Sequence, residues 1–194
     1  MPTTPPGRLA FTGDAAADTL LAAQPMALLI GFVLDQQVSV QKAFGGPLEL
    51  QRRIGSLDAA FIAAMDPADL EAAFKARPAL HRFPGNMARR VQELCRAVVE
   101  RYGGDASRVW EEAADGPDLE TRLLALPGIG EMKARSLIAV LGKRFGLDIP
   151  ALDSVMPQHP TLGDVDSAEA LARYQAQKRA YKQGLKGGGS TPHS

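Results

Sequence analysis

An all-α fold is predicted by three features of this sequence. Alanine is abundant and aromatic residues make up only 6% of the chain, which favours helices over strands. The alternation of apolar and polar residues that marks a half-buried strand is hard to find. The chain has 194 residues, 45% hydrophobic and 23% charged, which suits one sizeable core or two small lobes.

Helix signals divide the first part of the chain. Residues 1–13 are rich in Pro, Thr and Gly and predict an irregular lead-in. Asp14 can cap a helix at about 15–23, and Pro25 suits the first turn of the next helix. This second helix is apolar nearly all round up to Leu34, so we expect it to be central and buried.

The second helix is predicted to continue to Phe44, where a Gly-Gly-Pro sequence breaks the chain. Cys95 falls on the apolar face of a later helix and Trp110 lies in a short one, and we expect both side chains in the core. Caps and apolar spacing place the helices of this region at about 48–54 and 57–64, from 67, from 87 to 102, and at about 107–114.

Three polar residues, Asp35, Gln36 and Gln37, directly follow the apolar run. Polar groups at the end of a buried helix need hydrogen-bond partners or an opening to solvent, so a functional site and a solvated helix end both fit the pattern. Arg89 and Arg90 pose a similar choice, because two cations near a helix start oppose the helix dipole. Phosphate contact would explain them, and so would a solvated face.

The second half of the chain is organised around the sequence Leu-Pro-Gly-Ile-Gly at 126–130. One helix leads into it and another, at about 131–145, leaves it. Gly128 and Gly130 suit a turn too tight for a Cβ atom. The N–H groups that open the second helix lack partners within it, and with Lys133 in the first turn they form a site suited to one phosphate.

This turn, with Ala134 four residues after it, gives the pattern L-P-G-I-G-x-x-x-A. The pattern resembles the helix-hairpin-helix motif of DNA repair proteins. The resemblance implies that the backbone of Gly128, Ile129 and Gly130, together with Lys133, contacts a DNA strand. A hairpin of two helices whose glycines merely allow a close turn is the simpler alternative.

A second segment, Val-Leu-Asp-Gln-Gln-Val-Ser-Val-Gln-Lys-Ala, resembles the Q-Q-x-S-x-x-x-A segment of alkylbase DNA glycosylases in the same superfamily. There the segment lies beside the flipped base, which implies that Gln36 or Gln37 fills the gap left in the duplex. A third match is the superfamily's K-A-x-x-I-x-x-L-A segment, where this chain has Met87 and Ala88. The three matches, over about 26–153, imply a two-lobed helical HhH-GPD DNA glycosylase fold.

The expected organisation combines this resemblance with the charge pattern. A glycosylase-like domain is predicted over 1–165, with the hairpin at 119–145. A basic helix follows at 166–186, where five basic residues and no acidic one lie between Arg173 and its end. Residues 187–194 are expected to form a disordered tail.

The superfamily's catalytic aspartate lies about 20 residues after the last hairpin glycine. Asp148 lies 18 residues after Gly130 and Asp153 lies 23 after it, so neither falls on the family position. Asp153, then Asp148, then Asp35 are therefore the candidate catalytic carboxylates. Bifunctional relatives carry a lysine nucleophile two residues after that glycine, and here the residue is Met132, which implies no lyase chemistry.

The resemblance implies a monofunctional DNA glycosylase that flips an alkylated or deaminated base out of DNA and hydrolyses its N-glycosidic bond. The alternative is a non-catalytic DNA-damage-binding module of the same fold, which the displaced aspartates support. A helical interaction protein without a nucleic-acid role is a third interpretation, because Lys+Arg and Asp+Glu are equal at 22 each.

The expected partner is double-stranded DNA with a damaged base, bound by a monomer. Cys95 is the only cysteine, which excludes an intramolecular disulfide and a four-cysteine iron–sulfur cluster. We expect no metal site, and the resemblance allows a monovalent cation at the hairpin. The sequence has neither a signal peptide nor an apolar run of membrane-spanning length, so we expect a cytoplasmic protein.

Overall fold

The computed structural model describes residues 3–187, and every regular element within this range is helical. This confirms the predicted all-α fold. The α-helices are α1 (Ala15–Ala23), α2 (Pro25–Leu34), α3 (Val40–Ile54), α4 (Ala59–Ala64), α5 (Pro67–Lys75), α6 (Pro84–Tyr102), α7 (Arg108–Glu111), α8 (Gly116–Leu124), α9 (Glu131–Arg144) and α10 (Ala168–Gly187). Two 3-10 turns, η1 (Leu152–Ser154) and η2 (Leu162–Asp164), lie between α9 and α10.

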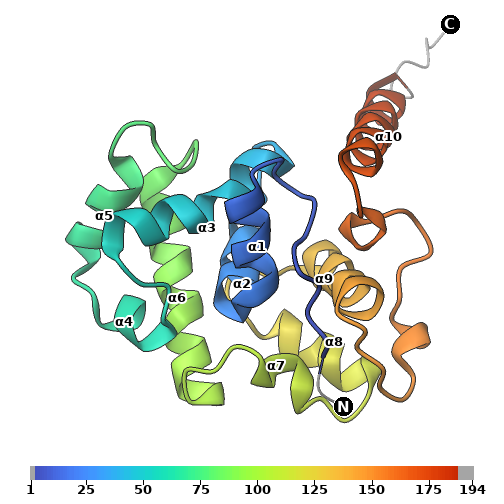
Figure 1. Cartoon of the computed structure of the whole chain (residues 1–194), viewed down its shortest axis with the longest axis horizontal. Helices are drawn as coiled ribbons and strands as arrows, with labels where there is room; N and C mark the ends of the chain where they lie inside the picture. Colours follow the sequence, from blue (N-terminus) through green and yellow to red (C-terminus); the bar gives the residue numbers. More distant parts are fainter. Residues whose placement is uncertain (1–2, 188–194) are drawn as a thin grey trace, which may run out of the picture.

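Two lobes flank α2, which lies near the middle of the molecule (Figure 1). One lobe contains α3 to α6, in which α4 and α5 both pack on α6. The other contains α8 and α9, with η1 against α8 and η2 against α9. Helix α2 contacts α3 and α6 of the first lobe, and its Val33 contacts Lys133 and Gly128 of the second, so α2 joins the two lobes.

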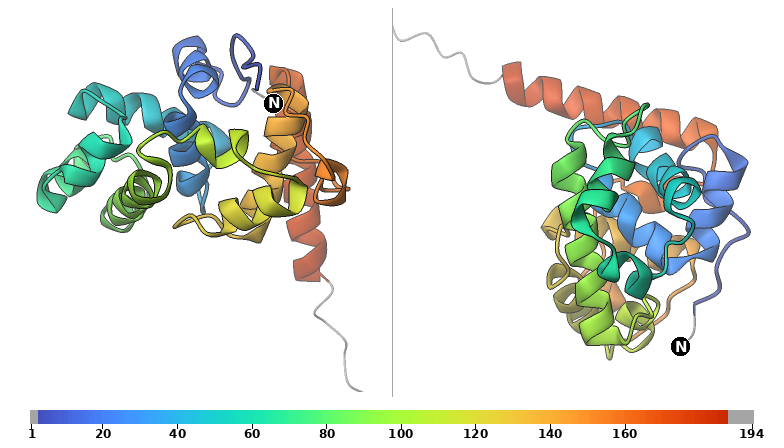
Figure 2. Two further views of the ribbon diagram at one scale, coloured as in Figure 1. Left: turned by 90° about the horizontal axis from the view of Figure 1, so that it is seen from below. Right: turned by 90° about the vertical axis from the view of Figure 1, so that its left-hand side faces the viewer.

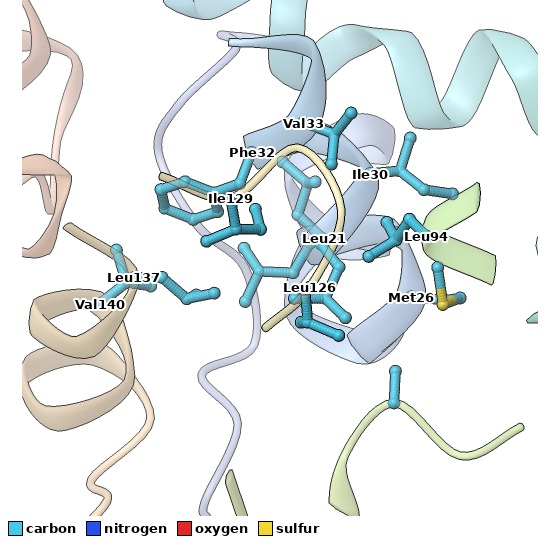
Figure 3. Close-up of a cluster of buried hydrophobic side chains, with 14 of the residues drawn as sticks. Leu21, Met26, Ile30, Phe32, Val33, Leu94, Leu126, Ile129, Leu137 and Val140 are labelled. Atoms are coloured by element: carbon cyan, nitrogen blue, oxygen red, sulfur yellow. The ribbon is translucent and has the colours of Figure 1, made fainter. Parts of the chain in front are cut away.

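The hydrophobic core is built around α2, whose residues are all buried after the first. Figure 3 shows Leu126 and Ile129, from the loop between α8 and α9, among side chains of α2 that include Phe32. Cys95 and Trp110 are also buried in this core, as predicted. The hairpin loop is therefore part of the core on its inner side.

The helix predicted at 26–44 is wrong at its centre, because the chain forms two helices there. Helix α2 ends at Leu34, and α3 starts after Ser39, whose Oγ accepts a hydrogen bond from the N–H of Lys42 at 3.1 Å. Helix α3 then continues through the Gly-Gly-Pro sequence at which a break was predicted. Gly46 serves close packing instead, since a Cβ there would lie 2.6 Å from Cδ1 of Leu34.

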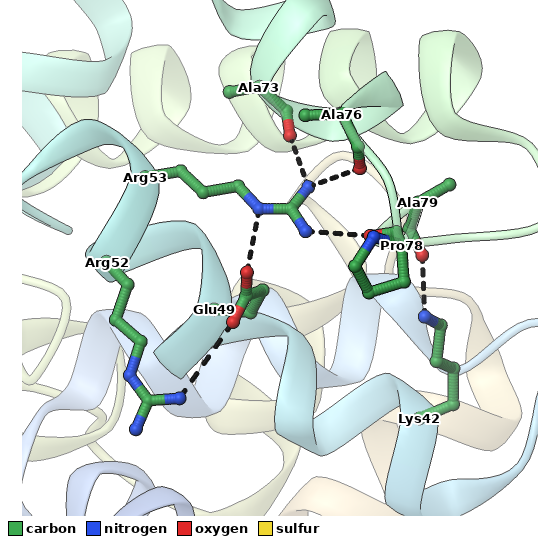
Figure 4. A network of polar contacts seen from close by, with 8 residues as sticks. All are labelled: Lys42, Glu49, Arg52, Arg53, Ala73, Ala76, Pro78 and Ala79. Atoms are coloured by element: carbon green, nitrogen blue, oxygen red, sulfur yellow. Dashed lines mark hydrogen bonds and ion pairs between the residues drawn. The ribbon is translucent and has the colours of Figure 1, made fainter.

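Basic side chains of α3 fix the loop that runs from α5 to α6 (Figure 4). Nη1 of Arg53 donates hydrogen bonds to the carbonyl oxygens of Ala73 at 2.7 Å and Ala76 at 2.9 Å. Nη2 donates to the carbonyl oxygen of Pro78 at 2.7 Å, and Nε donates to Oε1 of Glu49 at 2.9 Å. The loop thereby passes in a fixed position beside the end of α2.

Helix α10 lies where the basic helix was predicted, and it crosses the molecule before its last turns extend past the other helices (Figure 2). Its side is joined to α3 by the amides of Gln41 and Gln175, which exchange hydrogen bonds of 3.3 and 2.7 Å. Residues 188–194, most of the tail predicted to be disordered, lie outside the described residues.

Among the described residues, no single helix has the length and apolar composition of a membrane span. The pair α1 and α2, bent by 114° at its junction, meets these two criteria only when the helices are taken together.

Gly163 sets how closely η2 packs on α9. A Cβ there would lie 2.6 Å from the backbone C and O of Ala139. We expect Gly163→Ala to lower the free energy of unfolding by about 1–3 kcal/mol, because backbone atoms cannot move aside. Gly45→Ala is the matched control: nothing lies within 4 Å of its Cβ, and alanine should gain about 0.5–1 kcal/mol in a helix. Urea unfolding would measure both, and a fully stable Gly163→Ala protein would contradict this packing.

Candidate functional site

The loop between α8 and α9 packs tightly on the end of α2. Gly128 has φ +82°, and a Cβ there would lie 3.1 Å from Cγ2 of Val33. The N–H of Ile129 donates a hydrogen bond to the carbonyl oxygen of Leu126 at 3.2 Å, and the Ile129 side chain is buried. Of the residues predicted to contact DNA here, Ile129 therefore offers only its backbone to a ligand.

The start of α9 faces outward without a capping side chain. Its first internal hydrogen bond runs from the N–H of Ala134 to the carbonyl oxygen of Gly130 at 2.9 Å, and Gly130 supplies no side-chain cap. Gly130 also has an ordinary φ of −90°, and nothing lies within 4 Å of a Cβ built on it. The fold itself therefore does not require glycine at this position, whereas a ligand that approaches the backbone would.

Lys133 ties this hairpin to α2. Its ammonium group donates hydrogen bonds to the carbonyl oxygen of Val33 at 3.0 Å and to that of Gly128 at 3.3 Å. The carbonyls at the end of a helix lack partners within the helix, so the ammonium satisfies one of them in α2. Burial lowers the pKa of Lys133, while the nearby charge of Asp35 raises it. The predicted phosphate-binding lysine thus points toward the protein.

His81 satisfies the next carbonyl of α2. Its Nδ1 accepts a hydrogen bond from the N–H of Phe83 at 3.0 Å, so its Nε2 carries the proton and donates to the carbonyl oxygen of Leu34 at 3.0 Å. Burial lowers the pKa of His81, which keeps the ring neutral near pH 7. This residue supports the end of α2 and lies on the loop that Arg53 fixes.

Asp35 follows directly on these two supported carbonyls. Burial raises the pKa of its carboxyl group, and the charges of Lys178, Lys133 and Lys182 oppose that rise. Its side chain is half-buried, and within residues 3–187 no side chain or N–H donates a hydrogen bond to the carboxylate. The position at a helix C-terminus is also unfavourable for a negative charge. Asp35 is thus a half-buried carboxylate that receives no hydrogen bond from the described residues and has lysines nearby.

Two of the predicted polar residues complete the surroundings of Asp35. Gln36 is half-buried, and its Oε1 accepts a hydrogen bond from Nη1 of Arg90 at 3.1 Å. Gln37 is exposed and has φ +56°, a strained conformation for a residue other than glycine. Arg89 points elsewhere, because its Nη2 donates to Oδ1 of Asn86 at 3.1 Å.

Asp148 and Asp153 do not lie at the hairpin. Both are exposed and line a pocket of about 540 Å³ together with Gly142 and Gly146, at the C-terminal end of α9. The hairpin and Lys133 lie at the opposite end of this 14-residue helix. Of the three candidate carboxylates, the structure therefore brings only Asp35 to the hairpin.

Helix α10 contributes groups to the site that the sequence did not reveal. Tyr174 is half-buried, and burial together with the charge of Asp35 raises its pKa to about 12. Lys178 lies with its Nζ 5.7 Å from the centre of the Tyr174 ring. The sequence showed the apolar and basic residues of this helix, but not the part of the main body against which the helix packs.

The described residues contain no group of three His, Cys, Asp or Glu side chains that could hold a metal ion. The Cys95 thiol is buried, and burial raises its pKa to about 12. A monovalent cation at the hairpin would need carbonyl ligands, but Gly128 O already accepts from Lys133 and Leu126 O from the N–H of Ile129. A monovalent cation at the turn stays a prediction.

A family model for the HhH-GPD superfamily of base excision DNA repair proteins matches residues 30–184, from the middle of α2 into the last turn of α10. The chain belongs to this superfamily. Membership implies DNA binding and glycosylase-type base excision repair. Comparison with curated proteins gives no match. In this HhH-GPD protein the matched region includes the hairpin, Asp35 and most of α10.

The stability of the protein should reveal the unfavourable position of Asp35. Burial raises the pKa of Asp35 in the folded state above the ordinary value of 3.8. At pH values between the unfolded-state pKa and the folded-state pKa, the folded protein therefore binds more protons than the unfolded chain. The free energy of unfolding therefore falls as pH rises through the folded pKa. We expect Asp35→Asn to raise Tm at pH 7, with the gain lost below about pH 3.8. Asp153→Asn, at an exposed site, is the control, and a lower Tm for Asp35→Asn at pH 7 would refute this.

The two hairpin glycines should respond differently to alanine. We expect Gly130→Ala to leave Tm unchanged but to weaken duplex binding about tenfold, because its Cβ blocks a phosphate approaching the helix start. Gly128→Ala should lower the free energy of unfolding by about 1–2 kcal/mol, because φ is positive. Thermal melts and fluorescence anisotropy with a labelled duplex would separate the two effects. Unchanged DNA affinity in Gly130→Ala would argue against a phosphate at this turn.

Proposed function

We propose that this HhH-GPD protein is a monofunctional DNA glycosylase that removes an alkylated or deaminated base from double-stranded DNA by hydrolysis. The observation that supports this most directly is the half-buried carboxylate of Asp35 next to Lys133, the residue that joins the hairpin to α2. Burial penalises the charge of this carboxylate and the protein donates no hydrogen bond to it, so a role with a ligand explains its position.

The chemistry needs one carboxylate near the deoxyribose. As the bond from C1′ to the base nitrogen breaks, its electron pair leaves with the base and positive charge develops on the sugar. Asp35 would stabilise that charge and accept a proton from the water that attacks C1′. Burial raises its pKa above that of an exposed aspartate, which makes the carboxylate a stronger base.

The remaining site residues would hold the DNA in place. The N–H groups of Gly128, Gly130 and the first turn of α9 would bind a phosphate of the strand that carries the damaged base, while Ile129 holds the turn in the core. Gln37, exposed at the tip of the loop after α2, would enter the duplex where the base has left. Arg90 would hold the Gln36 side chain in position through its hydrogen bond to Oε1.

Two further groups have simpler parts in the same proposal. Arg89, exposed beside Asn86, would meet a phosphate at the edge of the interface. The positive charge of Lys133 would stabilise the ionised carboxylate of Asp35 and attract the phosphate held by the turn. Neither needs to touch the base.

Hydrolysis without lyase chemistry fits the residues at the start of α9. Met132, where bifunctional relatives have their lysine, has 82% of its surface exposed and offers no nucleophile. Lys133 donates hydrogen bonds to two carbonyl oxygens, which engage its protonated form. The expected product is therefore an intact strand with an abasic site.

The catalytic assignment has a direct mutational test. We expect Asp35→Asn to slow base release about 100- to 1000-fold, since a neutral amide cannot offset charge on the sugar. Asp148→Asn and Asp153→Asn, which lie at the far end of α9, should keep wild-type rates. Single-turnover release of free base from duplexes with alkylated or deaminated bases would measure all three.

The outcomes of this test separate the possibilities. Loss of activity in Asp153→Asn with a fully active Asp35→Asn protein would transfer the catalytic role to Asp153. A covalent enzyme–DNA adduct trapped by borohydride would contradict the monofunctional assignment. Absence of base release from every substrate in the wild type would overturn the enzymatic function itself.

A non-catalytic module that binds damaged DNA is the second candidate. It is favoured by the positions of Asp148 and Asp153, which leave the hairpin without the aspartate expected after it. Such a module would bind abasic or mismatched duplex more tightly than intact duplex and show no turnover. Equal binding by Asp35→Asn and wild type, with no base release by either, would favour this candidate.

A further inference from the structure

One side of α10 faces the main body in its first half. Leu171 is buried, Tyr174 is half-buried, and Gln175 exchanges hydrogen bonds with Gln41 of α3. Successive residues of an α-helix turn by about 100°, so residues seven apart share a side. The inward side of the first half therefore continues along the second half as a single stripe. Its members are Leu171, Tyr174, Lys178, Tyr181, Lys182 and Leu185.

The second half of this stripe has no cover. Both views in Figure 2 show the last turns of α10 extending past the other helices. Tyr181 is 70% exposed and Leu185 is 66% exposed, although they lie on the side that is buried nearer the start. Large apolar groups on the exposed part of an inward-facing stripe indicate a contact that the protein alone does not make.

The charge of the stripe selects the kind of partner. From Arg173 to the end of α10 there is no acidic residue. In the described part of the chain, neither Lys178 nor Lys182 takes part in an ion pair within 4.0 Å. Their charges act on Asp35, so the stripe borders the same site as the hairpin. A second copy of the chain would place like charges together, whereas a polyanion would neutralise them.

We infer that the overhanging stripe of α10, formed by Lys178, Tyr181, Lys182 and Leu185, is a second DNA-binding surface. Its lysines would contact phosphates beyond the flipped nucleotide, while the hairpin holds the strand on the other side of Asp35. Tyr181 and Leu185 would pack on sugars at the edge of the duplex. This inference rests on the DNA-binding function proposed above and adds to it a surface outside the two lobes.

The experiment measures how the affinity for an abasic-site duplex depends on salt. Each phosphate contact contributes about 0.9 to the slope of log K against log salt. We expect Lys178→Ala with Lys182→Ala to reduce that slope by about 1–2 and to weaken binding about tenfold or more at low salt. Circular dichroism and Tm would verify that the variant is folded.

The helix itself offers a charge-matched control. Arg173 and Arg179 lie on α10 but on other sides, more than about 100° from the centre of the stripe. Arg173→Ala with Arg179→Ala removes the same charge, and we expect its slope to match the wild type within about 0.5. Lys178→Arg with Lys182→Arg keeps the charge and should restore the wild-type slope. Lys178→Gln with Lys182→Gln replaces the alanine variant if that variant is unstable.

The readout is binding, so it does not depend on catalysis. If the wild type binds DNA and both double variants keep the wild-type slope, the role of the stripe is overturned and the proposed function stands. Equal losses in the two double variants would also overturn it, because only the total charge would matter. A wild type that fails to bind even at low salt would overturn the proposed function together with this surface. Dimerisation lost in Tyr181→Ala would identify a second copy as the partner and refute the inference.

Discussion

The ammonium group of Lys133 is the contact on which the site depends. It bonds to the carbonyl oxygens of Val33, 100 residues earlier in the chain, and of Gly128 in the hairpin turn. One side chain thereby joins the end of the central helix to the hairpin loop. The same charge acts on Asp35, so the contact that positions the hairpin also stabilises the charge of a half-buried carboxylate.

Aspartates lie at both kinds of helix end in this protein. Asp14, Asp58, Asp66 and Asp115 cap the N-termini of helices, where a negative charge is stabilising. Asp35 lies at the opposite end of a helix and is partly removed from water. Stability alone would not select it there, and conflicts of this kind concentrate at functional sites. The lysines of α9 and α10 offset this cost without forming hydrogen bonds to the carboxylate.

Local signals predicted the parts of the fold that depend on neighbouring residues. The cap at Asp14 and the burial of Trp110 were predicted because turn chemistry and apolar spacing act over a few residues. The break after Leu34 was missed, because the partners that end α2 come from elsewhere. His81 is 47 residues away, and the loop that carries it is fixed in turn by α3.

The sequence predicted a DNA-binding site at the hairpin but not which other residues would lie beside it. The hairpin and the glutamine segment were recognised from short patterns, and their proximity then followed from the shared contacts with α2. The choice among Asp35, Asp148 and Asp153 could not be made from spacing, because it depends on how the chain leaves α9. The position of α10 near Asp35 could not be predicted either, since the sequence of a basic helix does not show which part of the protein it packs against.

The equal numbers of acidic and basic residues in the chain do not argue against DNA binding. Many basic side chains are committed within the fold: Arg53 to Glu49 and three carbonyls, Arg122 to Asp118, and Lys143 to Asp164. A paired charge contributes little to the field outside the protein. The lysines that border Asp35 act instead on one half-buried group, and a phosphate at the adjacent surface would meet their charge directly. Affinity for a polyanion therefore depends on where cations without an acidic partner gather, and Lys178 and Lys182 lie near the carboxylate that follows α2.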